Sequence, residues 1–205
     1  MLKSSPVVFV VDPDKAFSAQ ICGIVTSVGL QGISFDSVET FLKIHSVDRP
    51  NCLVVNSVFL TTGDSTLYKK LESLRCEMPM IVVADKHGDV TTAVTVMKNG
   101  ALDYLEKPVD RSPFLDQIKI GLERDTDNEI LQISKRRVTT AINSLTPRQI
   151  QVMKFCIRGE RNKAIAHAMD VSIKTVEAHR AAVMNKMEAK SFVALVDDCR
   201  LIGFS

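Results

Sequence analysis

Residues 145–191 read LTPRQIQVMKFCIRGERNKAIAHAMDVSIKTVEAHRAAVMNKMEAKS, and their pattern of apolar and polar side chains predicts helices without strands. Thr146 before Pro147 is a helix N-cap followed by proline at the first helical position. Ser172 can cap a later helix across a turn of about three residues, which is the spacing of a helix-turn-helix. The predicted helices cover residues 147 to about 158, 162–169, 173 to about 187, and 191 to about 202.

The basic residues are concentrated at this end of the chain. Residues 145–205 carry 10 Lys and Arg against 6 Asp and Glu, whereas residues 1–124 carry 13 against 15. A basic domain on an otherwise slightly acidic protein favours a nucleic-acid partner, although the same charges would suit a solvated helix face. Charge alone leaves both interpretations open.

The overall composition is that of a folded protein, with 45% apolar and 24% charged residues. The apolar run at 7–11 is too short for a secretion signal or a membrane span, so we expect a cytoplasmic protein without membrane contact. The cysteines are widely spaced among apolar neighbours, which favours buried thiols over disulfides or a zinc site.

Several short motifs within residues 145–191 are marks of one family. They are Leu145-Thr146-Pro147-Arg148, Asn162-Lys163, Ile165-Ala166, Lys174-Thr175-Val176-Glu177, His179-Arg180, and Lys186-Met187 with Lys190-Ser191. Through them the segment resembles the LuxR-type helix-turn-helix of FixJ/NarL response regulators over nearly its whole length. The resemblance implies an all-α four-helix domain that places its third helix in the major groove of double-stranded DNA.

The third helix divides into a core face and a face for DNA. Val176, Val183 and Met187 share one side and are expected in the core. On the other side, lysine and arginine can donate to phosphates or guanine, glutamate can accept from cytosine, and alanine can touch a thymine methyl group. The expected DNA-contacting residues are Lys174, Thr175, Glu177, Ala178, His179, Arg180, Ala181 and Lys186 on this helix, with Asn162 and Lys163 beside it.

Three of these residues have alternative roles. Glu177 is as well suited to a salt bridge with Lys174 or Arg180 as to a base contact. Lys186 suits a solvated surface as well as a phosphate. His179 is expected to hydrogen-bond to backbone or phosphate rather than to act as an acid or a ligand.

The N-terminal part alternates short β-branched runs with helical patterns. Because these runs are continuously apolar, they suit strands buried on both faces, and the helical connections let successive strands run parallel. The runs cover residues 7–11, 32–35, 53–55, 81–84 and 102–105. They predict a five-stranded, doubly wound α/β domain whose site lies at the carboxyl ends of the strands, where Asp12, Asn56, 84–85 and Lys107 would gather.

Residues 7–17, VVFVVDPDKAF, and 97–108, MKNGALDYLEKP, resemble the receiver domain of the same regulators. The resemblance implies a fold that takes a phosphoryl group onto an aspartate after its third strand. In that family Mg²⁺ is held by this aspartate and by an acidic pair after the first strand. A lysine after the fifth strand pairs with the phosphoryl oxygens, and a Ser or Thr after the fourth strand senses them.

The residues for this chemistry are incomplete. Asn56 stands at the acceptor position, and a neutral amide does not form an acyl phosphate. Of the acidic pair Asp12 is kept, but Pro13 replaces the second acid, and Asp14 lies one residue further on. Since Mg²⁺ prefers carboxylate ligands in near-octahedral geometry, we expect no phosphorylation and no tight metal site.

Other positions of the pocket are partly retained. Ala84 replaces the switch hydroxyl, whereas Tyr104 and Lys107 remain. One expectation is that Lys107 pairs with Asp12 and donates to the side-chain carbonyl of Asn56, which would hold the pocket together without a ligand. The alternative is that Asn56 is only a satisfied polar residue at a strand end.

A helical pattern joins the two parts of the chain. It begins near Ser112 and contains no Gly or Pro over residues 122–146. The pattern fits either one long helix or two in tandem, with a break expected at 123–129, where apolar residues are missing. The predicted division is a receiver-like domain at 1–122, a helical linker at 123–143, and a LuxR-type domain at 144–205.

Together the motifs predict a sequence-specific transcriptional regulator that acts independently of aspartyl phosphorylation. The resemblance implies that its receiver-like domain forms a homodimer, through about residues 90–117, or binds a regulatory protein. The alternative is that the altered pocket senses a small ligand or a partner protein, with Lys86 and His87 as candidate anion contacts. Neither an enzyme nor a cofactor is expected, because no catalytic or glycine-rich phosphate motif occurs in the required context.

Overall fold

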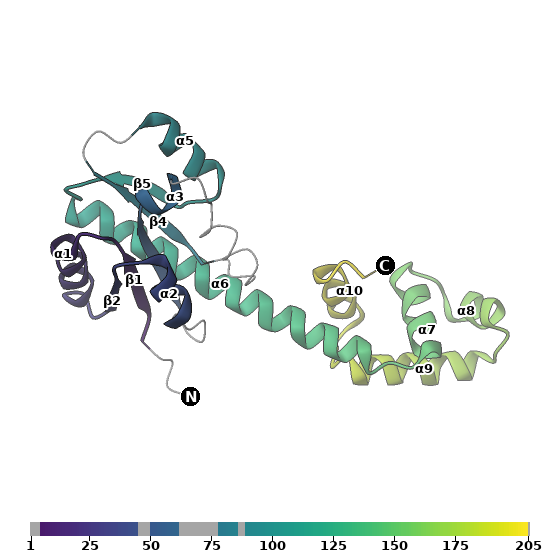
Figure 1. Ribbon diagram of the computed structural model, residues 1–205. Coiled ribbons are helices and arrows are strands. Elements are labelled where there is room, and N and C mark those ends of the chain that lie inside the picture. Colours follow the sequence, from purple (N-terminus) through teal and green to yellow (C-terminus); the bar gives the residue numbers. More distant parts are fainter. Residues whose placement is uncertain (1–4, 45–49, 62–77, 86–88, 205) are drawn as a thin grey trace. The chain divides into compact units, whose positions relative to one another are not determined.

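The computed structural model describes residues 5–44, 50–61, 78–85 and 89–204. The chain divides into two compact units, Met1–Glu129 and Ile130–Ser205, which are treated separately below. Figure 1 shows the strands gathered in the first unit and the short C-terminal helices in the second.

The first unit is built on a parallel sheet with the strand order β2-β1-β3-β4-β5. Every residue of β1, β3 and β4 is buried, as the continuous apolar runs predicted. The strands are β1 (Val7–Val11), β2 (Gln31–Phe35), β3 (Asn51–Asn56), β4 (Met80–Ala84) and β5 (Asp103–Glu106). The predicted five-stranded, doubly wound fold is therefore confirmed.

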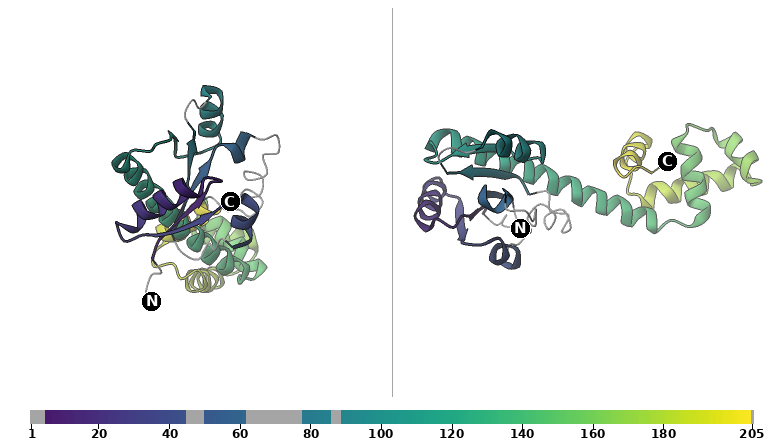
Figure 2. Two further views of the ribbon diagram at one scale, coloured as in Figure 1. Left: turned by 60° about the vertical axis from the view of Figure 1, so that its left-hand side comes forward. Right: turned by 45° about the horizontal axis from the view of Figure 1, so that its top comes forward.

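Alternate residues of β1, β3 and β4 contribute to separate cores on the two faces of the sheet. On one face Phe9 packs with Phe35 and Phe41, beneath α2 and α5. On the other face Val8 and Val10 pack against α1 and the first part of α6 (Figures 1 and 2). The helices of this unit are α1 (Lys15–Thr26), α2 (Val38–Ile44), α3 (Val58–Thr61), α5 (Val90–Lys98) and α6, which begins at Arg111.

Helix α6 runs without interruption over Arg111–Asn143, so the break expected at 123–129 is wrong. Polar side chains in this stretch have hydrogen-bond partners, one of them distant in the chain, that apolar periodicity does not reveal. The Thr126 hydroxyl donates to the carbonyl of Leu122 at 2.8 Å, and the Asp125 carboxylate accepts the backbone N–H of Asn51 at 2.9 Å. Burial nevertheless raises the pKa of Asp125 above its ordinary value.

The second unit contains α7 (Pro147–Ile157), α8 (Asn162–Met169), α9 (Ile173–Lys186) and α10 (Phe192–Leu201). Thr146 and Gln149 form a reciprocal capping box at the start of α7, and Ser172 caps α9 through the N–H of Thr175. Helix α8 ends at Asp170 in the left-handed conformation, with φ 53°. The expected all-α domain and its helix limits are confirmed to within one or two residues.

The described cysteines are free thiols, and Cys52, Cys156 and Cys199 are buried. Burial raises the pKa of Cys52 to about 12, so its thiol stays protonated. None of the described helices has the length and apolar character needed to cross a membrane.

Gly121 allows α6 to approach the sheet closely. A Cβ at this position would lie 2.8 Å from Sγ of Cys52 and 3.0 Å from Cδ1 of Leu102. We expect Gly121→Ala to lower the free energy of unfolding, measured in urea, by about 1–2 kcal/mol because the added methyl group overpacks this contact.

The matched control is Gly23→Ala in α1, where an added Cβ meets no atom within 4 Å. This substitution should raise stability by about 0.5–1 kcal/mol, since alanine restricts the backbone of the unfolded chain. Equal effects of the two substitutions would contradict the close approach of α6.

Candidate functional site

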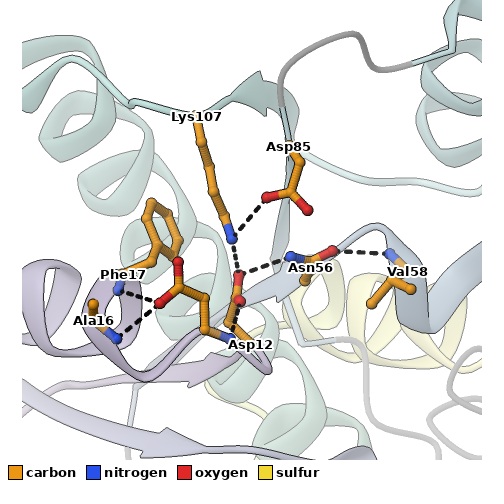
Figure 3. Close-up of polar contacts among 8 residues, drawn as sticks. Asp12, Ala16, Phe17, Asn56, Val58, Asp85 and Lys107 are labelled. Carbon is orange, nitrogen blue, oxygen red and sulfur yellow. Dashed lines mark hydrogen bonds and ion pairs between the residues drawn. The ribbon is translucent and has the colours of Figure 1, made fainter.

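The carboxylate of Asp12, at the end of β1, is the centre of the pocket at the carboxyl edge of the sheet (Figure 3). Its side chain has no exposed surface. Oδ2 lies 2.8 Å from Nζ of Lys107 and 3.0 Å from Nδ2 of Asn56, and Oδ1 accepts the N–H of Asp14 at 2.8 Å. Both carboxylate oxygens are thus occupied by donors from the protein itself.

Asn56, the last residue of β3, is 3% exposed and has both ends of its amide bonded. Nδ2 donates to Asp12, and Oδ1 accepts the N–H of Val58 at 3.0 Å, at the start of α3 (Figure 3). The expected bond from Lys107 to the Asn56 carbonyl is therefore wrong, because the oxygen faces α3 instead. Asn56 is held by two bonds of its own.

Lys107 follows β5 and connects three parts of the pocket. Its backbone N–H donates to the carbonyl of Ala84 at 2.8 Å. Its ammonium pairs with Asp12, lies 3.2 Å from Oδ1 of Asp85, and stands 4.2 Å from the ring centroid of Phe17. The expected pairing with Asp12 is confirmed.

The acidic side chain nearest in sequence to Asp12 is engaged elsewhere. Oδ1 of Asp14 accepts the N–H groups of Ala16 and Phe17 at 2.9 and 3.1 Å, which caps the first turn of α1 (Figure 3). Pro13 supplies no ligand atom from its side chain. Asp14 therefore caps α1 and does not act as a second carboxylate beside Asp12.

These residues do not fit Mg²⁺, which needs several free oxygen ligands. Asp12 already accepts from Lys107 and Asn56, the Asn56 oxygen accepts from Val58, and Asp14 caps a helix. Within the described ranges, no three His, Cys, Asp or Glu side chains lie together as a metal cluster.

Ala84 and Tyr104 are the other two residues that the sequence predicted in the pocket. Ala84 is buried at the end of β4 and has only a methyl group. Tyr104 is partly buried against the core that contains Phe9. Its pKa is raised by desolvation and by the nearby charges of Glu106 and Asp89. Lys86 and His87, the candidate anion contacts, lie outside the described residues.

A second candidate surface is the outer face of α9. Val176, Val183 and Met187 are buried, as expected for its core face. Thr175 and His179 are partly exposed, and Lys174, Glu177, Ala178 and Ala181 are exposed together with Lys163 of α8. In the described part of the chain Glu177 forms no ion pair with Lys174 or Arg180.

Arg180 is bound inside the domain rather than free on that face. Its Nη1 donates to Oδ1 of Asn162 at 2.8 Å, and its guanidinium carbon lies 5.7 Å from the ring centroid of Phe192. Arg180 thereby links α9 to the first residues of α8 and α10. The side-chain oxygen of Asn162, which is expected to face phosphate, accepts this hydrogen bond from Arg180.

Lys186 also has internal partners. Its ammonium donates to the carbonyl of Ser144 at 2.8 Å and to Oε1 of Gln149 at 3.0 Å. Nearby, Nη2 of Arg137 donates to both carboxylate oxygens of Asp198, at 2.8 and 2.9 Å. Sequence reasoning missed Arg137, Gln149 and Asp198, because no local pattern signals partners so distant along the chain.

Comparisons with known proteins agree with both units. Residues 8–119 match the family model "Response regulator receiver domain", and residues 143–198 match "Bacterial regulatory proteins, luxR family". The chain is 32% identical to "Transcriptional regulatory protein FixJ" of Rhizobium meliloti, covering 96% of both chains. It is 30% identical to "Nodulation protein W" of Bradyrhizobium diazoefficiens, covering 97% of this chain and 87% of that protein.

Solved structures of full-length regulators are also similar. The response regulator StyR shares 29% identity with a TM-score of 0.82, over 96% of this chain and 99% of StyR. Full-length FixJ from B. japonicum shares 30% identity with a TM-score of 0.55, over 96% of this chain and 97% of that chain.

The stabilisation of the buried Asp12 carboxylate by Lys107 can be measured by a double-mutant cycle. We expect Lys107→Met to lower the free energy of unfolding by about 3 kcal/mol, because it leaves a buried carboxylate without its cation. Adding Asp12→Asn should recover most of this loss, as the charge itself is then gone. Urea denaturation of the two single variants and the double variant checks both statements.

The matched control is Lys43→Met on the exposed side of α2, which should change stability little. Additive losses at Asp12 and Lys107 would contradict the assigned ion pair.

Proposed function

The chain belongs to the FixJ/LuxR family of DNA-binding transcriptional response regulators, and we propose that it acts without phosphorylation of its receiver domain. The observation that carries this proposal is the bonding of Asp12, whose carboxylate accepts from both Lys107 and Asn56. The groups that would receive a metal and a phosphoryl oxygen are already bonded to each other.

Chemistry at Asn56 supports the same proposal. A carboxylate attacks phosphorus with a negatively charged oxygen, whereas the amide oxygen of Asn56 is neutral and already accepts from Val58. Ala84 adds no hydroxyl that could bind a phosphoryl oxygen. The pocket therefore serves as a fixed structural centre of the receiver domain.

We assign DNA reading to the exposed residues of α9. Lys174 is suited to phosphate or guanine, Glu177 to the amino group of cytosine, and Ala178 and Ala181 to thymine methyl groups. Lys163, at the start of α8, is suited to phosphate. Groups with such complementary chemistry on one exposed helix face are what major-groove recognition requires.

The residues with internal partners receive a different role in this proposal. Arg180 and Asn162 position α9 against α8, and Lys186 ties the end of α9 to the chain before α7. Thr175 belongs to the capped first turn of α9, and His179 is retained as a backbone or phosphate contact. Apart from His179, these residues support DNA binding by fixing the recognition helix.

Self-association through α5 fits this mode of action. Val90, Val94 and Met97 are 76%, 48% and 43% exposed, and their spacing of four and three residues places them on one side of the helix. Exposed apolar side chains grouped in this way favour a protein partner, for which we propose a second copy. Such a dimer would present two recognition helices about 10 base pairs apart.

DNA affinity should be the same with and without acetyl phosphate and Mg²⁺. The check is salt-dependent binding of the purified protein to genomic DNA fragments, together with the intact mass of the treated protein. Asn56→Asp alone should remain unphosphorylated because position 13 still lacks a metal ligand, whereas Pro13→Asp with Asn56→Asp should be phosphorylated. A phosphoryl group on the natural chain, or tighter DNA binding after treatment, would contradict the proposal.

Two substitutions separate reading from positioning on α9. Lys174→Ala should weaken DNA binding and reduce the salt slope by about 1, with thermal stability unchanged. Arg180→Ala should lower the melting temperature as well as the affinity, because it breaks the links to Asn162 and Phe192. Lys43→Ala is the control, and unchanged DNA binding by Lys174→Ala would rule out its assigned contact.

A further inference from the structure

The first unit carries an apolar groove at the opposite edge of the sheet from Asp12. It has a volume of about 720 Å³ and opens where β1 and β3 begin, at Pro6 and Pro50. Its other apolar walls are Val28 and Leu30, after α1, and two leucines of α6 at positions 115 and 122. Val28 is 51% exposed, so much of its apolar side chain is open to a partner in the groove.

One rim of the groove is acidic. Asp116, Glu123 and Asp127 are exposed residues of α6, and their spacings of seven and four place them on one side of the helix. Lys119 is the cation among the lining residues, which leaves a net charge of −2. Across the described ranges none of these carboxylates forms an ion pair, so their charge is available to a partner.

The length of the groove favours an elongated partner. Its lining on α6 extends from Leu115 to Asp127, which corresponds to about 18 Å along a helix. This length matches about three turns of a second helix, whose apolar residues at every third or fourth position could contact the groove walls. Basic residues beside that apolar stripe would then face the acidic rim.

We propose that this groove binds a basic amphipathic helix of a partner protein. Apolar side chains of the partner pack against Val28, Leu30 and the two leucines of α6, and its lysines or arginines pair with the carboxylates of Asp116, Glu123 and Asp127. Such a site gives the receiver domain an input that does not use the Asp12 pocket. The inference does not require DNA binding, so it stands or fails separately from the proposed function.

The test uses the full chain and labelled synthetic helical peptides of about 15 residues. One peptide has leucines along one face flanked by lysines, a second has glutamates in place of the lysines, and a third scrambles the first. Fluorescence anisotropy should show binding of the lysine peptide, with at least about tenfold weaker binding of the other two. Binding of the lysine peptide should weaken as salt is added.

Variants of the chain locate the site. Glu123→Gln with Asp127→Asn should weaken binding of the lysine peptide about tenfold, and so should Val28→Gln, which changes an exposed side chain. Glu39→Gln on the exposed side of α2 is the charge control and should bind as the natural chain does. Circular dichroism should confirm that all variants remain folded.

Three results would overturn the proposal. The first is equal binding of the lysine and glutamate peptides, and the second is a groove variant that binds as tightly as Glu39→Gln. The third is displacement of the peptide by a compact amine, such as phenethylamine, at a concentration comparable to that of the peptide. That last result would make the groove a small-molecule site.

Discussion

A carboxylate without exposed side-chain surface lies at the end of β1, and its charge has to be compensated inside the protein. Compensation comes from Lys107 after β5 and from Asn56 at the end of β3. Because these donors come from different strands, the buried charge connects the carboxyl ends of β1, β3 and β5. The ammonium of Lys107 also lies over the ring of Phe17, which connects α1 to these strands.

The changes in the pocket are mutually consistent. Because position 56 is neutral, Asp12 is the buried carboxylate of the Asp12–Asn56 pair, and the ammonium of Lys107 lies 2.8 Å from it. The acid displaced to position 14 becomes a helix cap, and position 84 carries only a methyl group. Asp12, Asn56 and Asp14 all have hydrogen-bond partners within the protein, which fits the proposed function.

Sequence reasoning succeeded where the signal is local. Continuous valine runs identify strands buried on both faces, and Thr146-Pro147 and Ser172 locate helix starts to within a residue. It failed for α6, because the bond of Asp125 to Asn51 stabilises a stretch without apolar periodicity. It did not reveal the internal partners of Arg180 and Lys186, which lie 18 and 42 residues away in the chain.

The bond between Asn56 and Asp12 limits which residues position 56 can carry. A change to aspartate there would place a second buried carboxylate about 3 Å from the first, where like charges repel strongly. Proline at position 13 provides no side-chain ligand for a cation that would reduce this repulsion. Under the proposed function, aspartate at position 56 alone would therefore lower the stability of the receiver domain without making it a phosphorylation site.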